Sequence, residues 1–522
     1  MYKPVILVVL DGWGLGKSGN GNAITLAKTP TIKKLNEYYP HIALQASGVS
    51  VGLPWGEVGN SEVGHITLGA GKILYQNMPR ITMAIQNGEF FKNEAFLKAI
   101  NDAKASNGAV HLMGLIGKGG VHSYIDHLYA ILETFHVQKF DNVFIHMFTD
   151  GRDSSPTSGL VSLLELQKRM ASYKVGKIAT ICGRYFAMDR NNAWDRTEKS
   201  YNAITKGEGI QITDPAKYLE ESYAKEVFDE YMEPAVVTKD GQPIGKVSEG
   251  DSVIFFNFRE DRARQLTKAF VIPGFSKFER DFLKNLTFVT LTQYEANLPV
   301  DVAFPPEKSE EQLGRIVSKA GLAQLRIAET EKFAHVTYFF NGGVEDPYPR
   351  EERMIIPSVT VESFDKAPEM SAQEITDHVI GALNMNKYSF ILMNYANADI
   401  VGHTGSTEAT VKAVEKVDNC LAQLIPAVLQ KGGCLLITAD HGNAEELKNN
   451  LTGEADTEHS INPVPLWFVA PDNHREQPLE ERFDNIEAKG LLSDVAPTAL
   501  DLMGLPKSNE MTGESLIPIL SR

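Results

Sequence analysis

Residues 5–12 have the sequence VILVVLDG. Six consecutive Val, Ile and Leu residues, ended by Asp-Gly, are typical of a strand that is buried on both faces of a parallel sheet. The same pattern, an apolar run followed by a polar cluster, returns four times along the chain. These runs are residues 143–148, 253–258, 390–395 and 434–438. We therefore predict strands at all five places, with polar side chains at their carboxyl ends.

Helical patterns lie between these runs, for example at residues 160–173 and 409–428. Strands that alternate with helices predict doubly wound α/β sheets with right-handed crossovers. The 522 residues are enough for roughly two to four domains. Linkers are indicated near residues 76–79 and in the Pro-rich stretch 297–306. We expect a discontinuous domain, residues 1–76 and 307–522, with a second domain, residues 77–306, inserted into it.

The composition argues against several classes of partner. The chain has 51 basic and 67 acidic residues, a formal charge of −16, so its surface repels nucleic acid and anionic membranes. Binding of an anionic metabolite would require a local cluster of arginines. Because the acidic composition indicates no large apolar patch, we expect a monomer.

Cysteine usage and apolar runs indicate the compartment. Cys182, Cys420 and Cys434 lie far apart and outside any CxxC pattern, which predicts buried thiols in a reducing environment. The first apolar run stops at Asp11, short of a signal peptide. No later run approaches the roughly 20 residues that span a bilayer. We expect a cytoplasmic protein without a membrane partner.

Carboxylate and imidazole side chains lie at the ends of the predicted strands and in nearby loops. Asp399 and His403 are one helical turn apart, so they can bind the same ion. Mixed Asp and His ligands suit Mn²⁺ or Zn²⁺ better than Ca²⁺ or Mg²⁺. A single Asp-His pair could equally form a hydrogen-bonded turn, but several groups at successive strand ends favour a metal site. The candidate ligands are Asp11, Asp399, His403, Asp440, His441 and His459.

Ser61 stands among small residues in the segment 59–65, just ahead of a predicted helix. Taken alone, such a serine is typical of a helix N-cap. The positive end of a helix also suits a phosphoryl group. A neighbouring metal ion would stabilise the serine alkoxide at neutral pH and make it a nucleophile. The segment by itself leaves both interpretations open.

Longer motifs identify a family. The segments Gly-Gly-Val-His-Ser (119–123), Asp-Gly-Arg-Asp (150–153) and Ala-Glu-Thr-Glu-Lys (328–332) are its most specific features. On these motifs the chain resembles, essentially end to end, the cofactor-independent (2,3-bisphosphoglycerate-independent) phosphoglycerate mutases of the alkaline phosphatase superfamily. The other matching segments are residues 10–14, 59–65, 183–185, 187–190, 257–259, 261–265, 394–397, 401–405, 440–443 and 462–465, together with His459.

The resemblance implies a fold and a reaction. Two α/β domains would face each other across a cleft: a discontinuous alkaline-phosphatase-like domain that binds metal, and an inserted transferase domain that binds substrate. The reaction would interconvert 3-phosphoglycerate and 2-phosphoglycerate in glycolysis and gluconeogenesis through a phosphoserine at Ser61, without 2,3-bisphosphoglycerate. Because water must be kept out of such a transfer, we expect the cleft to close by hinges at both linkers.

The same resemblance implies the site residues. Two divalent ions are expected, with Mn²⁺ preferred over Zn²⁺ or Co²⁺. One would be held by Asp399, His403 and His459, and the other by Asp11, Ser61, Asp440 and His441.

A basic set matches the family's substrate positions. Its guanidinium groups suit the carboxylate and the phosphate of phosphoglycerate. Asp153 is expected to act as a general base, and Lys332 to stabilise charge on the transferring group. A surface salt bridge is the alternative for any single arginine. The set is His122, Arg152, Asp153, Arg184, Arg190, Arg259, Arg262 and Lys332.

The chain departs from the family pattern at several positions, and two alternative functions are still open. None of the departures removes a predicted ligand, although Lys118 and Tyr124 adjoin His122. A metal-dependent phosphatase or phosphopentomutase of the superfamily would keep the ligands but would not need His122, Arg152 or Arg190. A non-catalytic metal-binding or scaffold protein is the second alternative. The departures are Gly117-Lys118, Tyr124, Asn192-Ala193, Ala398 and Ser460-Ile461.

Overall fold

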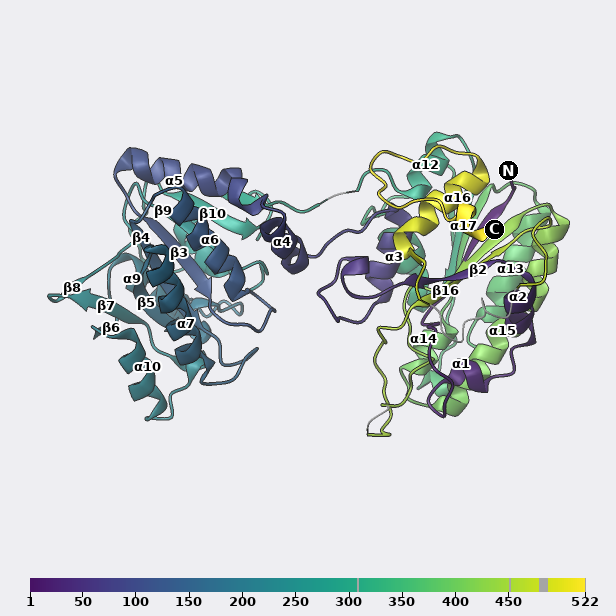
Figure 1. Ribbon diagram of the computed structural model, residues 1–522, viewed down its shortest axis with the longest axis horizontal. Coiled ribbons are helices and arrows are strands. Elements are labelled where there is room, and N and C mark those ends of the chain that lie inside the picture. Colours follow the sequence, from purple (N-terminus) through teal and green to yellow (C-terminus); the bar gives the residue numbers. More distant parts are fainter. Residues whose placement is uncertain (308, 450–451, 478–486, 522) are drawn as a thin grey trace. The chain divides into compact units, whose positions relative to one another are not determined.

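The computed structural model describes residues 1–307, 309–449, 452–477 and 487–521. The chain divides into two compact units (Figure 1): unit 1 is Met1–Gln76 with Glu307–Arg522, and unit 2 is Asn77–Pro306. Each unit is built around its own β-sheet. Within the described residues, no helix has both the length and the apolar character that a membrane span requires.

Unit 1 contains an eight-stranded sheet in the order β13-β12-β14-β1-β15-β16-β2-β17. Its pairs are parallel except that β16 runs antiparallel to β15 and to β2. The predicted strands at residues 5–10, 390–395 and 434–438 form β1, β14 and β15 with these bounds. The strands are β1 (Val5–Leu10), β2 (His41–Gln45), β12 (Gln324–Glu329), β13 (Glu351–Ile356), β14 (Phe390–Tyr395), β15 (Cys434–Thr438), β16 (Val464–Val469) and β17 (Gly490–Leu491).

Helices cover both faces of this sheet, with α13 and α15 on one face and α3, α12 and α16 on the other (Figure 1). The predicted helix 409–428 is two residues longer at each end, and the Ser406 side chain caps its first turn. The helices are α1 (Ala23–Leu26), α2 (Pro30–Tyr38), α3 (Ser61–Ala70), α12 (Leu313–Lys319), α13 (Ala372–Asn384), α14 (Asn397–Gly402), α15 (Thr407–Gln430), α16 (Val495–Met503) and α17 (Ile517–Leu520).

Unit 2 contains a second sheet, in the order β11-β10-β9-β3-β4-β5-β7-β6, with β8 paired to β7. Its pairs are parallel except β5–β7 and β7–β8. The predicted strand 253–258 ends at Phe255, because the Phe258 N–H bonds to the His122 carbonyl rather than to a neighbouring strand. The strands are β3 (Val110–Leu115), β4 (Val143–Thr149), β5 (Lys177–Gly183), β6 (Ile210–Ile212), β7 (Ala235–Lys239), β8 (Gln242–Pro243), β9 (Ser252–Phe255), β10 (Thr287–Thr292) and β11 (Asp301–Phe304).

The side chains of this sheet alternate between two cores. Leu112 and Ile254 pack in the core that includes α5 and α6, whereas Met113 and Phe255 pack in the core that includes α9 and α11. The helices are α4 (Asn77–Gln86), α5 (Glu94–Ser106), α6 (Ile125–Val137), α7 (Ser158–Tyr173), α8 (Arg184–Ala187), α9 (Trp194–Thr205), α10 (Pro215–Tyr223) and α11 (Arg264–Val271).

Helix α3 lies unusually close to its neighbours because two of its residues are glycines. A Cβ atom at Gly64 would stand 2.7 Å from the Asp440 carbonyl oxygen, and one at Gly69 would stand 2.0 Å from the Phe340 carbonyl oxygen. Both separations are too short for a carbon atom. Gly64 therefore brings the first turn of α3, which begins at Ser61, against the segment that follows β15, and Gly69 brings the last turn against Phe340.

A matched pair of substitutions tests this packing. Gly381 lies inside α13 with nothing within 4 Å of its Cβ position, so Gly381→Ala is expected to raise the free energy of unfolding by up to about 1 kcal/mol through helix propensity. Gly64→Ala gains the same propensity but clashes with Asp440, and is expected to lower the free energy of unfolding by about 1–3 kcal/mol. Urea unfolding measures both. Equal stabilities of the two variants would contradict the account.

Candidate active site

Asp399, His403 and His459 form one cluster. Asp399 Oδ1 lies 3.2 Å from Nε2 of each histidine, and the two Nε2 atoms are 3.0 Å apart. Each ring donates from Nδ1 to a backbone carbonyl at 2.7 Å, His403 to Thr457 and His459 to Gly59. In the neutral rings both Nε2 atoms therefore carry lone pairs.

This cluster fits a metal ion. Two lone pairs and a carboxylate oxygen face one another at these separations, an arrangement that needs a shared proton or a cation between them. The three ligand atoms lie within 4.8 Å of one another. Nitrogen and oxygen donors of this kind suit Mn²⁺ and Zn²⁺. The three residues are the ones that the resemblance implies for one of the two metals.

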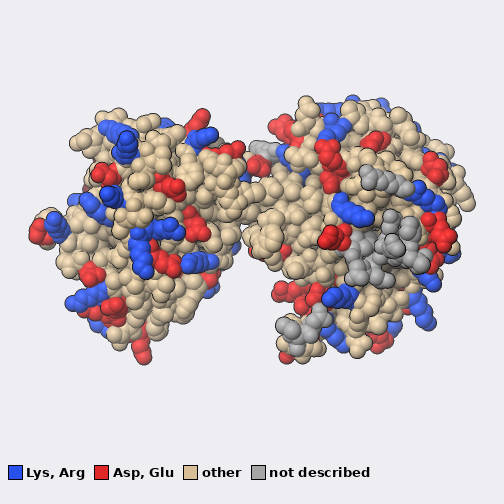
Figure 2. Space-filling model, viewed as in Figure 1, with Lys and Arg blue, Asp and Glu red and all other residues tan. Residues whose placement is uncertain are grey.

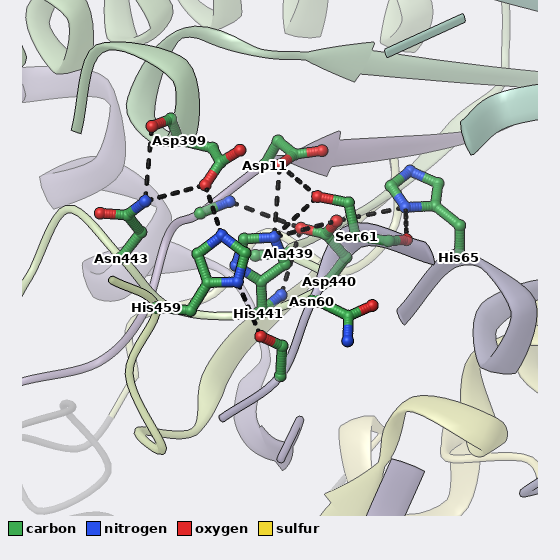
Figure 3. A network of polar contacts seen from close by, with 12 residues as sticks. Asp11, Asn60, Ser61, His65, Asp399, Ala439, Asp440, His441, Asn443 and His459 are labelled. Atoms are coloured by element: carbon green, nitrogen blue, oxygen red, sulfur yellow. Dashed lines mark hydrogen bonds and ion pairs between the residues drawn. The ribbon is translucent and has the colours of Figure 1, made fainter. Parts of the chain in front are cut away.

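The other predicted ligands, Asp11, Ser61, Asp440 and His441, lie in a second, adjoining cluster (Figure 3). Ser61 Oγ is 2.8 Å from His441 Nε2 and 3.2 Å from Asp11 Oδ1. His441 Nε2 is 3.5 Å from Asp11 Oδ1 and 3.6 Å from Asp440 Oδ2. His441 donates from Nδ1 to the Gly442 carbonyl, so in the neutral ring the Nε2 lone pair faces the serine and the carboxylates. This donor set also fits a divalent cation.

Lys332 connects the two clusters. It lies in the short helix η4 (Thr330–Lys332), directly after β12. Its Nζ donates to Asp11 Oδ1 and Asp399 Oδ2, both at 2.6 Å, and to Ser61 Oγ at 2.7 Å. Burial opposes the charged form, but the carboxylates of Asp11, Asp399 and Asp440 raise the Lys332 pKa well above its usual value. The ammonium group is therefore a fixed positive charge beside the serine.

The same carboxylates raise the pKa values of two imidazoles, those of His441 and His403. Burial acts to lower the pKa of His441, yet Asp440, Asp11 and Asp399 raise it to about 10. The hydrogen bond to Asp399 raises the pKa of His403. In turn, despite burial, Lys332 and the histidines hold the pKa of Asp399 well below its ordinary range. Without a metal ion, His441 therefore holds a proton near neutral pH.

The N-cap interpretation of Ser61 is wrong. The cap of α3 is Asn60, whose side-chain oxygen accepts from the Val63 N–H. Ser61 is the first residue of the helix, and its hydroxyl is buried among Asp11, His441 and Lys332. Its hydroxyl therefore does not cap the helix and belongs to the polar cluster instead.

Three further residues orient the predicted ligands. His65 donates from Nδ1 to the Ser61 carbonyl at 2.8 Å, and this atom is also 3.2 Å from Asp440 Oδ2. Asn394 donates to Asp11 Oδ2 at 2.7 Å, and Asn443 donates to Asp399 Oδ1 at 2.8 Å. No role was predicted for them from the sequence, although all three fall in family-matching segments. Asn394 and Asn443 are amides rather than metal ligands, so no ligand spacing in the sequence points to them.

Unit 2 gathers the predicted substrate residues other than Lys332, which belongs to unit 1. Arg184 is buried and donates from Nη1 to Asp150 at 2.6 Å and to Asp153 at 2.5 Å. His122 Nε2 lies 3.8 Å from Asp153 Oδ2. Burial, and then Arg184, lowers the His122 pKa to about 4, so this imidazole is neutral at physiological pH.

Asp261, for which no role was predicted from the sequence, links three members of this set. Its carboxylate accepts from Arg190 at 2.7 Å, and lies 3.2 Å from Arg259 Nε and 3.5 Å from His122 Nδ1. Arg262 donates to the Met188 carbonyl; burial, together with Arg184 and Arg190, lowers the pKa of Arg262.

One other member of the set and one departure form ion pairs of their own. Arg152 forms an ion pair with Glu230 at 3.4 Å. Lys118, one of the departures from the family pattern, forms an ion pair with Glu165 at 3.0 Å. The structure therefore shows a cluster of cationic groups held by carboxylates, which suits an anion with more than one charged group.

Fold and site together define a class of protein. In unit 1, a buried serine hydroxyl lies beside carboxylates and imidazoles that fit divalent cations, at the carboxyl ends of parallel strands. These are the components of metal-dependent phosphoryl transfer. The molecule is a phosphoryl-transfer enzyme of this kind.

Comparisons with known proteins identify the family. The family model described as "BPG-independent PGAM N-terminus" matches residues 81–296. A 2,3-bisphosphoglycerate-independent phosphoglycerate mutase of Moorella thermoacetica is 49% identical over 516 residues, which cover 99% of this chain and 98% of that protein. The Clostridium novyi protein of the same name is 50% identical over 515 residues, covering 98% and 99%. The chain belongs to the family of 2,3-bisphosphoglycerate-independent phosphoglycerate mutases.

A solved structure agrees with this assignment. The structure of Leishmania mexicana phosphoglycerate mutase at low cobalt concentration is 29% identical and superposes with a TM-score of 0.52, covering 98% of this chain and 97% of that chain. The predicted family and fold class are confirmed. The chain is an isomerase of glycolysis that interconverts 3-phosphoglycerate and 2-phosphoglycerate. A phosphatase, a phosphopentomutase and a non-catalytic scaffold are thereby set aside.

Metal affinity is expected to depend on pH. Because the pKa of His441 is about 10 in the metal-free protein, its proton must leave when a metal binds at Nε2. Affinity should therefore rise between pH 6 and pH 8, about tenfold per pH unit for each proton released. Calorimetric titration with Mn²⁺, in buffers of different ionisation enthalpy, measures both affinity and proton release. An affinity that is constant from pH 6 to pH 8 would contradict the assignment of His441 as a ligand.

Proposed function

We propose that Ser61 carries the phosphoryl group between the two hydroxyls of glycerate, as a phosphoserine. The observation that carries this proposal is the position of its hydroxyl, within 2.7–3.2 Å of Lys332, His441 and Asp11. The Lys332 ammonium lowers the cost of negative charge on Oγ and on the transferring group. The N-terminus of α3 adds its positive end to the same place.

Two divalent ions complete this centre in the proposal. Asp399, His403 and His459 would hold one, and Asp11, Ser61, Asp440 and His441 the other. When bound, they would neutralise charge on the phosphoryl oxygens and favour the serine alkoxide. We propose Mn²⁺, which mixed nitrogen and oxygen donors support, with Zn²⁺ or Co²⁺ as substitutes.

Unit 2 is proposed to bind the substrate, and unit 1 to perform the transfer. Arg190, Arg259 and Arg262 would bind the carboxylate and phosphate, replacing their present carboxylate and carbonyl partners. Asp153 would accept the proton of the attacking hydroxyl, since a carboxylate held by Arg184 is available as a base. His122, neutral in this environment, can donate or accept a hydrogen bond without adding charge.

Retention of glycerate distinguishes a mutase from a phosphatase. The phosphoserine must react with a glycerate hydroxyl before water reaches it, so water has to be excluded during the transfer. The proposal therefore requires that glycerate be retained until it takes the phosphoryl group back from Ser61. We further propose a cytoplasmic monomer. Acidic and basic side chains are interspersed on the visible face (Figure 2), which supports a soluble chain that binds neither nucleic acid nor an anionic membrane.

The first experiment measures conversion of 3-phosphoglycerate to 2-phosphoglycerate, coupled to enolase, without 2,3-bisphosphoglycerate. The protein is stripped with chelator and then given Mn²⁺, while free phosphate is followed in parallel. Activity is expected to return with the metal, with little phosphate released. Release of phosphate without isomerisation would contradict the protected transfer.

Ser61→Ala is expected to abolish isomerisation, with a loss of at least about 10⁴-fold, because no other group would carry the phosphoryl. Ser371→Ala is the control. Ser371 is also a buried serine of unit 1, and it loses only a hydrogen bond to the Pro357 carbonyl. Its activity should remain near that of the unaltered protein. Retained activity in Ser61→Ala would refute the proposal.

Arg190→Ala is expected to reduce kcat/KM by about 10- to 100-fold, since it removes a charged hydrogen bond to the substrate. Arg169→Ala is the control in the same unit, because that guanidinium lies over the Tyr129 ring at 5.2 Å and outside the cluster. Steady-state kinetics with 3-phosphoglycerate measures both. Equal kinetics of the two variants would remove Arg190 from the substrate site.

A further inference from the structure

A π-helix lies beside the proposed nucleophile. After η4, which carries Lys332, the chain forms η5 (His335–Phe339), and the Phe340 N–H bonds to the His335 carbonyl, five residues back. π-Helices are rare in proteins, and those that do occur frequently lie at functional sites. The end of this segment packs on α3, where Gly69 leaves room for the Phe340 carbonyl. The π-helix is thus fixed against the helix that begins at Ser61.

His335, the first residue of η5, lines the pocket of the site. This open pocket, with a volume of about 440 Å³, is also lined by Ser61, Lys332, Asp399 and His459. All of these residues belong to unit 1. His335 has no role in the reaction as described above.

The surroundings of the ring fix its orientation. The His335 ring stacks on Phe339 with centroids 5.2 Å apart and lies 5.4 Å from the ring of His65. Its Nδ1 is buried and has no hydrogen-bond partner among the residues that the structure describes. Its Nε2 is not one of the buried atoms that lack a partner, so Nε2 is the nitrogen left to contact a ligand in the pocket that His335 lines.

The state of the ring follows from this environment. Burial, and then His65, lowers the pKa of His335 to about 4, so the ring is neutral. A neutral imidazole has one N–H, and a buried N–H without an acceptor is rarer than a buried acceptor without a donor. The proton therefore belongs on Nε2, and the bare lone pair on Nδ1.

We propose that His335 is a further catalytic residue, which donates a hydrogen bond from Nε2 to an oxygen of the phosphoryl group on Ser61. This inference rests on the proposed function of Ser61. The donor adds to the positive charge of Lys332 without bringing a second cation into the site. It would act on the phosphoryl group in both directions of the transfer.

Three substitutions separate a hydrogen-bond role from a packing role. Gln places an amide N–H near the position of Nε2, Asn places one near Nδ1, and Phe keeps the ring but removes both nitrogens. We expect His335→Gln to retain kcat/KM within about fivefold, and His335→Phe and His335→Asn to lose about 10- to 100-fold, the usual effect of removing one hydrogen bond to a charged group. Thermal melting of each variant reports its folding.

The opposite order overturns the inference. If His335→Phe retains activity and His335→Gln loses it, the ring acts by packing. His378→Asn, in an exposed histidine of α13 paired with Glu374, is the control and should leave kcat/KM unchanged. Ser61→Ala, measured in parallel, separates the two proposals. Activity in Ser61→Ala refutes the phosphoserine, whereas a dead Ser61→Ala with a fully active His335→Phe refutes only the role of His335.

A measurement on the unaltered protein keeps the inference testable if a variant fails to fold. In ¹⁵N-histidine NMR of the Zn²⁺-loaded protein, the signals of His335 are expected to show the neutral Nε2–H tautomer and to shift when inorganic phosphate is added. They are assigned by their absence from the spectrum of any folded His335 variant, or by relaxation from a spin label at a nearby surface position. An Nδ1–H tautomer, or signals that phosphate does not move, would overturn the inference.

Discussion

Three buried carboxylates surround a single serine hydroxyl: Asp11 contacts Ser61 directly, Asp399 through Lys332 and Asp440 through His441. The charge of these groups is the main constraint on this site. Uncompensated buried charges cost several kcal/mol each. The protein places one fixed cation, Lys332, directly between Asp11 and Asp399. The remaining negative charge is available to divalent ions and imidazoles. A site that demands cations in this way is also a site that stabilises a transferring phosphoryl group.

The sheet order meets this constraint. Strands β12, β14, β1 and β15 are neighbours and parallel, so their carboxyl ends lie side by side. The segments that follow them carry Lys332, Asp399, Asp11 and Asp440 in the same order. Supporting residues then fix each group, because Asn394, Asn443 and His65 each bond to one carboxylate. Helix α3 brings Ser61 to this edge through the close approach at Gly64.

Much of this could be predicted from the sequence, because an apolar run followed by a polar cluster marks both a buried strand and its polar end. Residues 5–10, 390–395 and 434–438 form the expected strands. What depends on tertiary contacts could not be predicted. Asn60 rather than Ser61 caps α3, Asp261 links residues far apart in sequence, and the antiparallel β16 has no distinguishing pattern. His335 acquires its place only through a π-helix, which no periodicity in the sequence indicates.

The central claim is that the phosphoryl group resides on Ser61 during turnover. Rapid mixing of the Mn²⁺-loaded protein with 3-phosphoglycerate, quenching in acid within milliseconds and mass spectrometry of the peptides would test it most directly. The account predicts a phosphorylated peptide containing Ser61, which forms and disappears at rates at least as fast as kcat. A peptide that stays unmodified throughout turnover, or a phosphoryl group on another residue at that rate, would contradict it.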